Sequence, residues 1–197
     1  ALEIGQFAVD FMQNARPSAL VEERTKLFHT DSVLCGISAV ALGTNAPCLL
    51  RQEALDYQTP KGVPFFGSTV KVAPEKAIVA NSSAVREWDS NGTNFGYRKE
   101  LGAMTGATPE QIESAIGMVV AHYIPWRAIR AGKQLSDSKG ASAAISTEVA
   151  VLSMMRSMRG FVGPKDIFRN PESMFRQFVK TKGDSPFPLV LSTQGDD

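Results

Sequence analysis

The sequence has few cysteines and histidines, and this limits the chemistry that it can support. Cys35 and Cys48 are its only cysteines, and no Cys-x-x-Cys pair or Cys/His ligand spacing occurs. The sequence therefore predicts no metal site and no disulfide framework, and we expect both cysteines to be free thiols in a reducing compartment. The two histidines lie far apart; we expect His29 on the surface and His122, among apolar residues, in the core.

Long apolar runs and an excess of one charge are also missing. No apolar run reaches the roughly 18 residues that a membrane span needs. The 21 basic residues nearly balance 20 acidic ones, which leaves a formal charge of +1. Bulk electrostatics therefore indicates no nucleic-acid or membrane partner, and any anion site must be local. At 197 residues, 43% of them hydrophobic, the chain has enough apolar side chains for the core of one domain.

Apolar side chains recur at helical spacing through most of the chain, so we expect a mainly α-helical fold. A first helix over residues 4–12 closes at Asn14 and Pro17, and Ser18 can cap a longer second helix. We expect Asp31, on the inner face of the second helix, to be buried and hydrogen-bonded. The apolar residues predicted for that inner face are Leu20, Leu27, Phe28, Leu34 and Cys35.

Proline and capping residues predict where two further helices begin. Pro74 suits the first position of a helix that leads toward Asp89. Thr108, Pro109 and Gln111 have the spacing of a capping box, in which the threonine and glutamine side chains each bond to the backbone of the other residue.

The remaining chain predicts one long helix, one break and one short helix. The long helix runs from about residue 141 to residue 159, with Ile145 facing inward and Gly160 directly after its C-terminus. Gly and Pro within residues 43–47 predict a break. A Gly-Pro pair predicts a short helix over residues 163–168.

Two polar segments carry the residues that can perform chemistry. Residues 81–93 lead into a loop that holds Asp89 and Thr93, a carboxylate and a hydroxyl four positions apart. Residues 127–140 hold four cations and a second carboxylate, Asp137. An acidic, hydroxylated loop and a compact basic loop suit a site that binds and transforms a small polyanion, which favours an enzyme.

Several segments, taken in order, resemble the MmgE/PrpD family. Residues 29–36 (His-Thr-Asp-Ser-Val-Leu-Cys-Gly) look like its second-helix signature, and residues 66–81 are similar to its Gly-Ser, Pro-Glu-x-Ala and Asn stretch. Residues 89–93 (Asp-Ser-Asn-Gly-Thr) stand where the family usually has Asp-Phe-Asp-Asp-Thr. Residues 135–140 and 160–164 complete the pattern. The family includes 2-methylcitrate dehydratases and cis-aconitate decarboxylases, and the mitochondrial dehydratases look most similar.

The resemblance implies a helical domain over residues 1–185 and the start of a smaller α+β lid domain over residues 186–197. The chain is less than half of the usual family length, and a block of the family is missing between Glu100 and Leu101. The resemblance also implies a homodimer in the mitochondrial matrix and chemistry without a cofactor, including no iron–sulfur cluster. Ala1 opens the chain without Met, as in a trimmed mature form.

The activity implied by the resemblance is the dehydration of 2-methylcitrate, or a similar tricarboxylic acid, by a hydro-lyase. Asp89 would take an acid–base role and Thr93 would hydrogen-bond the substrate, because both match the family's Asp-x-x-x-Thr. Lys139, just before a predicted helix start, would add a point charge that binds a substrate carboxylate. The other substrate-binding candidates are Lys133, Arg130 and Ser136.

Structural roles stay open for these residues. Asp89 could cap a loop, Thr93 could be a plain turn residue and Lys139 a solvated surface lysine. Ser136 and Asp137 are typical of a helix cap. Two other functions are also open: a cis-aconitate decarboxylase, and a non-catalytic shortened relative that serves as a structural or partner-binding subunit.

Overall fold

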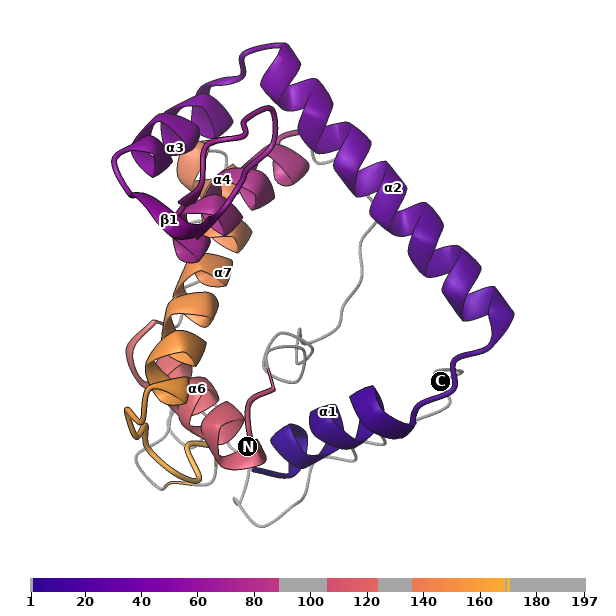
Figure 1. Ribbon diagram of the computed structural model, residues 1–197, viewed down its shortest axis with the longest axis vertical. Coiled ribbons are helices and arrows are strands. Elements are labelled where there is room, and N and C mark those ends of the chain that lie inside the picture. Colours follow the sequence, from indigo (N-terminus) through magenta and orange to yellow (C-terminus); the bar gives the residue numbers. More distant parts are fainter. Residues whose placement is uncertain (1, 89–105, 124–135, 169, 171–197) are drawn as a thin grey trace. The chain divides into compact units, whose positions relative to one another are not determined.

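The computed structural model describes residues 2–88, 106–123, 136–168 and 170, and only the backbone of Lys139 (Figure 1). The described chain is mainly α-helical, which confirms the predicted fold class. It divides into two compact units. Its elements are α1 (Leu2–Asn14), α2 (Ala19–Ala41), α3 (Asn45–Leu55), β1 (Gln58–Val63), α4 (Pro74–Arg86), α6 (Pro109–His122) and α7 (Asp137–Met158).

Unit 1 contains α1, α6 and the last residues of α7, from residue 153 onward. Helix α1 packs against α6 (Figure 1). The two helices approach closely at Gly5. A Cβ atom added at this glycine would lie only 2.7 Å from the carbonyl oxygen of Pro109. The buried cluster of this unit consists of Ala8, Ala107, Ile112, Ala115 and Met154.

The ends of the unit 1 helices follow the predicted caps. Thr108 Oγ1 accepts a hydrogen bond from Gln111 N at 3.3 Å, and Gln111 Oε1 accepts one from Thr108 N at 2.8 Å, which confirms the capping box. Gly160 has a φ of 91° after α7, and its N–H bonds to Ser157 O at 2.9 Å. This left-handed residue ends the helix as predicted.

Unit 2 contains α3, β1, α4 and most of α2, together with α7 as far as residue 152. Helix α3 packs on α4, and β1 also contacts α4 (Figure 1). Pro74 is at the start of α4, as predicted. The buried cluster of this unit consists of Ala54, Phe65, Val72, Ala77 and Ala80.

A hydrogen bond joins two parts of the segment that resembles the family's Gly-Ser to Asn stretch. Asn81 Oδ1, on α4, accepts from the backbone N–H of Phe66 at 2.8 Å. The chain turns there, with Gly67 at a φ of 70° and Ser68 N bonded to Phe65 O at 3.0 Å. In this chain, Asn81 thus fixes the turn that precedes α4.

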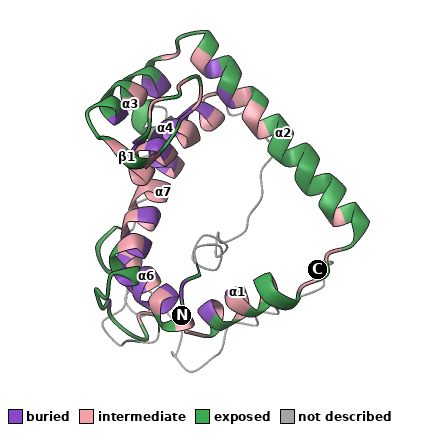
Figure 2. Cartoon of the chain, in the orientation of Figure 1, coloured by how far each residue is buried: buried purple, intermediate pink, exposed green. Residues whose placement is uncertain are grey.

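The predicted inner face of α2 is wrong. Leu20, Leu27 and Leu34 are 60%, 55% and 62% exposed, and Figure 2 shows exposed residues along most of this helix. Phe28 and Asp31 are also exposed, so the buried carboxylate predicted at Asp31 is wrong.

Small residues make the buried contact of α2 instead. Gly36 and Ala39 are buried, and a side-chain carbon at Gly36 would lie 2.7 Å from the ring of Phe66. The helix therefore approaches Phe66 through its small residues, and helical spacing of large apolar residues does not reveal this face.

Four further predictions are corrected. The break expected over residues 43–47 is shorter, because α3 begins at Asn45 and includes Pro47 in its first turn. Proline is tolerated there, because a backbone N–H in the first turn has no partner within the helix. Helix α7 begins at Asp137 instead of residue 141, and Ile145 is 46% exposed. Residues 163–168 form bends and a turn instead of a short helix.

The predicted division into a helical domain over residues 1–185 and a lid over residues 186–197 stays a prediction. Residues 171–197 lie outside the described residues.

Cys35 and Cys48 are both free thiols, as predicted.

Candidate functional site

The described residues include only part of the predicted site. Asp89, Thr93, Arg130 and Lys133 lie outside them. Ser136 is described and exposed, and the backbone of Lys139 lies in the first turn of α7. The site is therefore built from the helix that leads to the acidic loop and the helix that follows the basic loop.

Helix α4 leads to the acidic loop. It ends at Arg86, and Glu87 is its C-cap residue. The backbone N–H of Glu87 donates a hydrogen bond to Ala84 O at 3.4 Å. Trp88 follows and is 39% exposed. The predicted catalytic carboxylate, Asp89, is thus three residues beyond a helix C-terminus that is itself packed into unit 2.

The start of α7 carries the predicted cationic residue. Ser136 O accepts from Gly140 N at 3.4 Å, so Ser136 is the residue before the first helical turn, as its predicted capping role requires. Lys139 lies inside that first turn instead of before it. The N–H groups of a first turn have no helical partners, and together with the helix dipole they favour a carboxylate ligand.

Asn45 bonds to the first residue of α7. Its Nδ2 atom donates to Asp137 Oδ2 at 2.8 Å, across 92 positions of sequence. The contact joins the start of α3 to the start of α7, both in unit 2. Asp137 is thus not simply a capping residue, because its carboxylate also bonds to a neighbouring helix.

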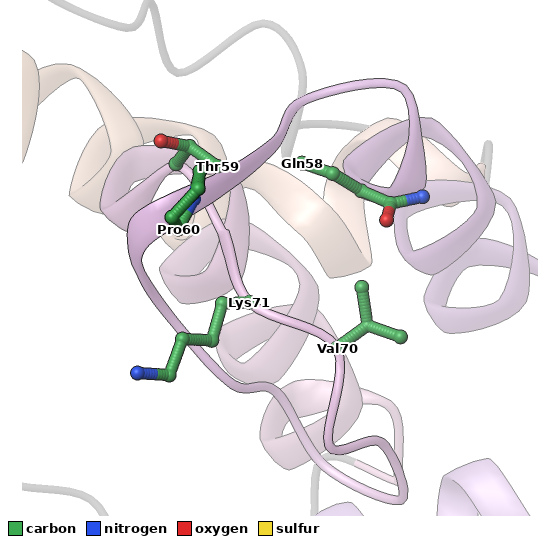
Figure 3. Close-up of a pocket in the computed structure, with 5 residues that line it drawn as sticks. All are labelled: Gln58, Thr59, Pro60, Val70 and Lys71. Carbon is green, nitrogen blue, oxygen red and sulfur yellow. The ribbon is translucent and has the colours of Figure 1, made fainter.

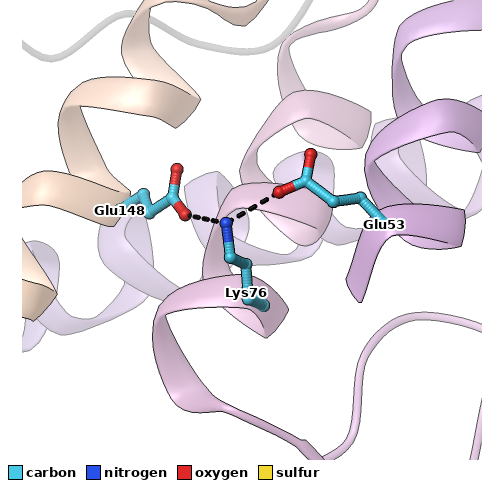
Figure 4. Close-up of polar contacts among 3 residues, drawn as sticks. All are labelled: Glu53, Lys76 and Glu148. Carbon is cyan, nitrogen blue, oxygen red and sulfur yellow. Dashed lines mark hydrogen bonds and ion pairs between the residues drawn. The ribbon is translucent and has the colours of Figure 1, made fainter. Parts of the chain in front are cut away.

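Lys76 forms a second polar contact in unit 2, which sequence analysis did not identify. Its Nζ atom donates to Glu53 Oε1 and to Glu148 Oε1, each at 2.7 Å (Figure 4). The lysine side chain is only 17% exposed, and its ammonium lies 4.8 Å from the centre of the Tyr57 ring. The three charged residues come from α3, α4 and α7, so one cation links three helices.

Two opposing effects act on the pKa of Lys76. Burial alone lowers the pKa, but the hydrogen bonds and negative charges of Glu148 and Glu53 raise it by more, and it lies above its ordinary value. Lys76 is therefore a cation at neutral pH and cannot serve as a general base there.

One signal in the sequence could have identified Lys76. It is the third residue of α4, where the helix dipole disfavours a cation. A lysine in a first turn therefore suggests carboxylate partners from elsewhere. Spacing along the chain does not reveal which carboxylates these are, because Glu53 and Glu148 lie 23 positions before and 72 after Lys76 (76 − 53 and 148 − 76).

A surface hollow lies beside β1, and the described residues that line it include none of the predicted site residues. Gln58, Thr59, Pro60, Val70 and Lys71 line it (Figure 3). It is open to solvent, and its lining has one cation and no carboxylate. It lacks the acid–base pair that a dehydration needs, so we do not assign the reaction to it.

The two histidines are both exposed. His29 is exposed, as predicted. His122 is exposed as well, at the end of α6 with its ring edge toward Tyr123, so the predicted core histidine is wrong. Within the described ranges, no three His, Cys, Asp or Glu residues are grouped as metal ligands would be.

No single helix of the described chain is long and apolar enough to cross a membrane, although α2 and α3, bent by 85°, meet that criterion as a pair.

A comparison with protein families addresses what the sequence resembles. Residues 93–186 match the family model of the MmgE/PrpD N-terminal domain. This match supports the MmgE/PrpD family, and it includes Thr93, Arg130, Lys133, Ser136 and Lys139. Asp89 and the similar segments at residues 29–36 and 66–81 lie before the matched range.

No curated protein and no solved structure matches the chain. The MmgE/PrpD match is therefore the one comparison that bears on function, and it supports a family of dehydratase type without specifying a substrate.

Proposed function

We propose that this chain contributes to a hydro-lyase site that dehydrates 2-methylcitrate or a similar tricarboxylic acid. The observation that carries the proposal is the MmgE/PrpD match, because it spans the basic segment and the start of α7 together. The resemblance also supports a homodimer in the mitochondrial matrix and a reaction without a cofactor, and these belong to the same proposal.

The chemistry of such a dehydration fits the residue types of the two segments. A proton beside a carboxylate must be removed, and a hydroxide must leave. The proton is weakly acidic because the neighbouring carboxylate resists further negative charge. A cation such as Lys139, with the amide groups of a helix start, stabilises the aci-carboxylate that forms, in which that one carboxylate group carries two negative charges. Asp89 serves in the proton transfers, which each contribute roughly 10²–10⁴ in rate.

Incubation with candidate acids tests the proposed reaction. The wild-type chain is expected to produce the alkene absorbance of a cis-aconitate-type product from 2-methylcitrate. Release of CO₂ from cis-aconitate, with no alkene from 2-methylcitrate, would assign the decarboxylase activity instead. Asp89→Asn is expected to abolish turnover with little loss of stability, and normal turnover by this variant would remove Asp89 from the mechanism.

Lys139→Ala tests the proposed cation. Because the charge stabilises the transition state more than the bound substrate, the variant is expected to have a lower kcat and a higher KM. Unchanged values of both constants would show that Lys139 is a solvated surface residue.

One observation favours a second candidate, a non-catalytic subunit. The leucines of α2 are exposed, and apolar faces of this kind are typical of surfaces that bind another protein segment. The intact mass of the natural protein separates the candidates. A mass near the 21.3 kDa of this chain favours the subunit, and a mass more than twice as large favours the enzyme.

A further inference from the structure

Two polar contacts hold α7 along one side, and both lie within unit 2. Near its start, Asp137 Oδ2 accepts from Asn45 Nδ2 of α3 at 2.8 Å. Farther along, Glu148 Oε1 accepts from Lys76 Nζ of α4 at 2.7 Å. The two acidic residues are 11 positions apart (148 − 137), which is about three helical turns, so they share one face of α7.

Two alanines between these contacts are buried. Ala141 is 6% exposed and Ala144 is 0% exposed. Small side chains allow a helix to lie close to its neighbours, but they interlock weakly and fix neither its rotation nor its position along its axis. The directional contacts at Asp137 and Glu148 supply what the alanines cannot.

We propose that Asn45 and Lys76 are positioning residues that hold the first turn of α7 in place for binding a tricarboxylate. The inference rests on the proposed function, because Lys139 belongs to this turn and Ser136 directly precedes it. Neither Asn45 nor Lys76 need touch the substrate. They act through Asp137 and Glu148, by limiting the rotation and sliding of α7 relative to α3 and α4.

The geometry of Lys76 explains why it suits this role. Its ammonium bonds to a carboxylate on each of two other helices, and its side chain is largely shielded from water. Charge-assisted hydrogen bonds are shorter and stronger than neutral ones, and partial burial reduces their screening by salt. Because Lys76 stays charged at neutral pH, its contacts with the two glutamates do not change with its protonation in the neutral range.

The two carboxylates of Lys76 provide a matched pair of variants. Glu148→Ala removes the ion pair between α7 and Lys76 of α4, whereas Glu53→Ala removes the ion pair between α3 and Lys76 and leaves Glu148 bonded. Both variants lose one carboxylate from the same ammonium. A general stability effect would therefore appear in both, and a positioning effect would appear only in Glu148→Ala.

Two measurements on the full chain separate these outcomes. The first is calorimetric binding of 2-methylcitrate, which we expect Glu148→Ala to weaken roughly three- to tenfold while Glu53→Ala changes it less than about twofold. The second is amide hydrogen exchange over residues 137–144, expected to accelerate only in Glu148→Ala. Glu148→Gln keeps an acceptor oxygen and is expected to restore most of both properties.

Each result decides one claim. Equal binding and equal exchange in Glu148→Ala and Glu53→Ala would overturn the positioning role. If the wild-type chain binds no tricarboxylate, the proposed function fails, and with it the purpose assigned to the positioning. The exchange comparison then still decides whether Lys76 and Glu148 hold the start of α7.

Discussion

A different kind of contact is prominent within each of the two units of the chain. In unit 1, backbone segments approach closely at Gly5 and Gly163, as they also do at Gly62 in unit 2, and the serine hydroxyls of unit 1 bond to backbone groups. Ser114 Oγ donates to Phe161 O at 3.2 Å and accepts from Gly163 N. In unit 2, charged side chains join the helices, as Lys76 does, and Arg51 lies 5.2 Å above the ring of Phe65.

This difference indicates which substitutions each unit tolerates. A contact between backbones leaves no space for an added carbon, because the main chain cannot move without disturbing its hydrogen bonds. A contact between long charged side chains can adjust, but it depends on charge and therefore on pH and salt. We expect both units to be sensitive to added volume at such glycines, and unit 2 to be sensitive to charge as well.

The largest expected effect is that of added volume in unit 1. In Gly163→Ala the new carbon would overlap the carbonyl oxygen of Ser114, and we expect a loss of about 2–3 kcal/mol in the free energy of unfolding. Gly140→Ala is the control, because nothing lies within 4 Å of its added carbon. Alanine favours the helix there by about 0.5–1 kcal/mol. Denaturant titration measures both, and equal effects would contradict the contrast.

A smaller effect is expected from Lys76→Met, which leaves two carboxylates without their cation. We expect a loss of about 1–2 kcal/mol in the free energy of unfolding at neutral pH, between the values for exposed and buried ion pairs. The folded pKa of Lys76 is raised above its ordinary value of 10.5, so its stabilising contribution is complete below that pH.

The pH dependence of the same variant gives the sign of the effect. As the pH rises above the ordinary lysine value toward the folded pKa, the unfolded chain loses its proton first, and the advantage of Lys76 disappears. Unfolding titrations at neutral and alkaline pH are expected to show the wild-type and Lys76→Met stabilities converging. A difference that stays constant at high pH would show that packing, not charge, is what Lys76 contributes.

Helix caps give a still smaller contrast between the units. Thr108 completes a capping box in unit 1, whereas the side chain of Thr44 in unit 2 makes no capping bond to α3 and donates to Ala39 O of α2 at a long 3.2 Å. We expect Thr108→Ala to cost about 1 kcal/mol and Thr44→Ala less than half of that. Thermal unfolding of both variants checks this, and equal losses would refute the assigned caps.

The smallest effect is expected at the exposed face of α2. Leu34→Gln replaces a side chain that is 62% exposed, so the free energy of unfolding is expected to change by no more than about 0.5 kcal/mol. A loss near 2 kcal/mol, measured by denaturant titration, would show that this face is covered in solution.

Local signals in the sequence predicted the starts of α4 and α6 but not the start of α7. The first position of α4 follows from Pro74, and the start of α6 follows from Thr108 and Gln111, because capping depends on residues a few positions apart. The prediction of the buried face of α2 was wrong for the opposite reason. Both of its sides carry apolar residues, and the buried side is chosen by the distant Phe66.

The site residues that the sequence indicates stay predictions. The basic segment and the helix after it were identified from charge and from the resemblance, and the family match covers both. Lys76 and Asn45 were missed, because each bonds to a residue more than 70 positions away that no local pattern indicates. Contacts of this kind are set by the fold, and the sequence indicates only that a lysine in a first helical turn needs a partner.

The central claim is that the start of α7, with Lys139, binds a tricarboxylate. Calorimetric titration of 2-methylcitrate into the wild-type chain and into Lys139→Gln tests it most directly. We predict binding by the wild type and an affinity about tenfold lower in the variant, the loss typical of a hydrogen bond to a charged group. Equal affinities for the two proteins, or no binding by the wild type, would contradict the claim.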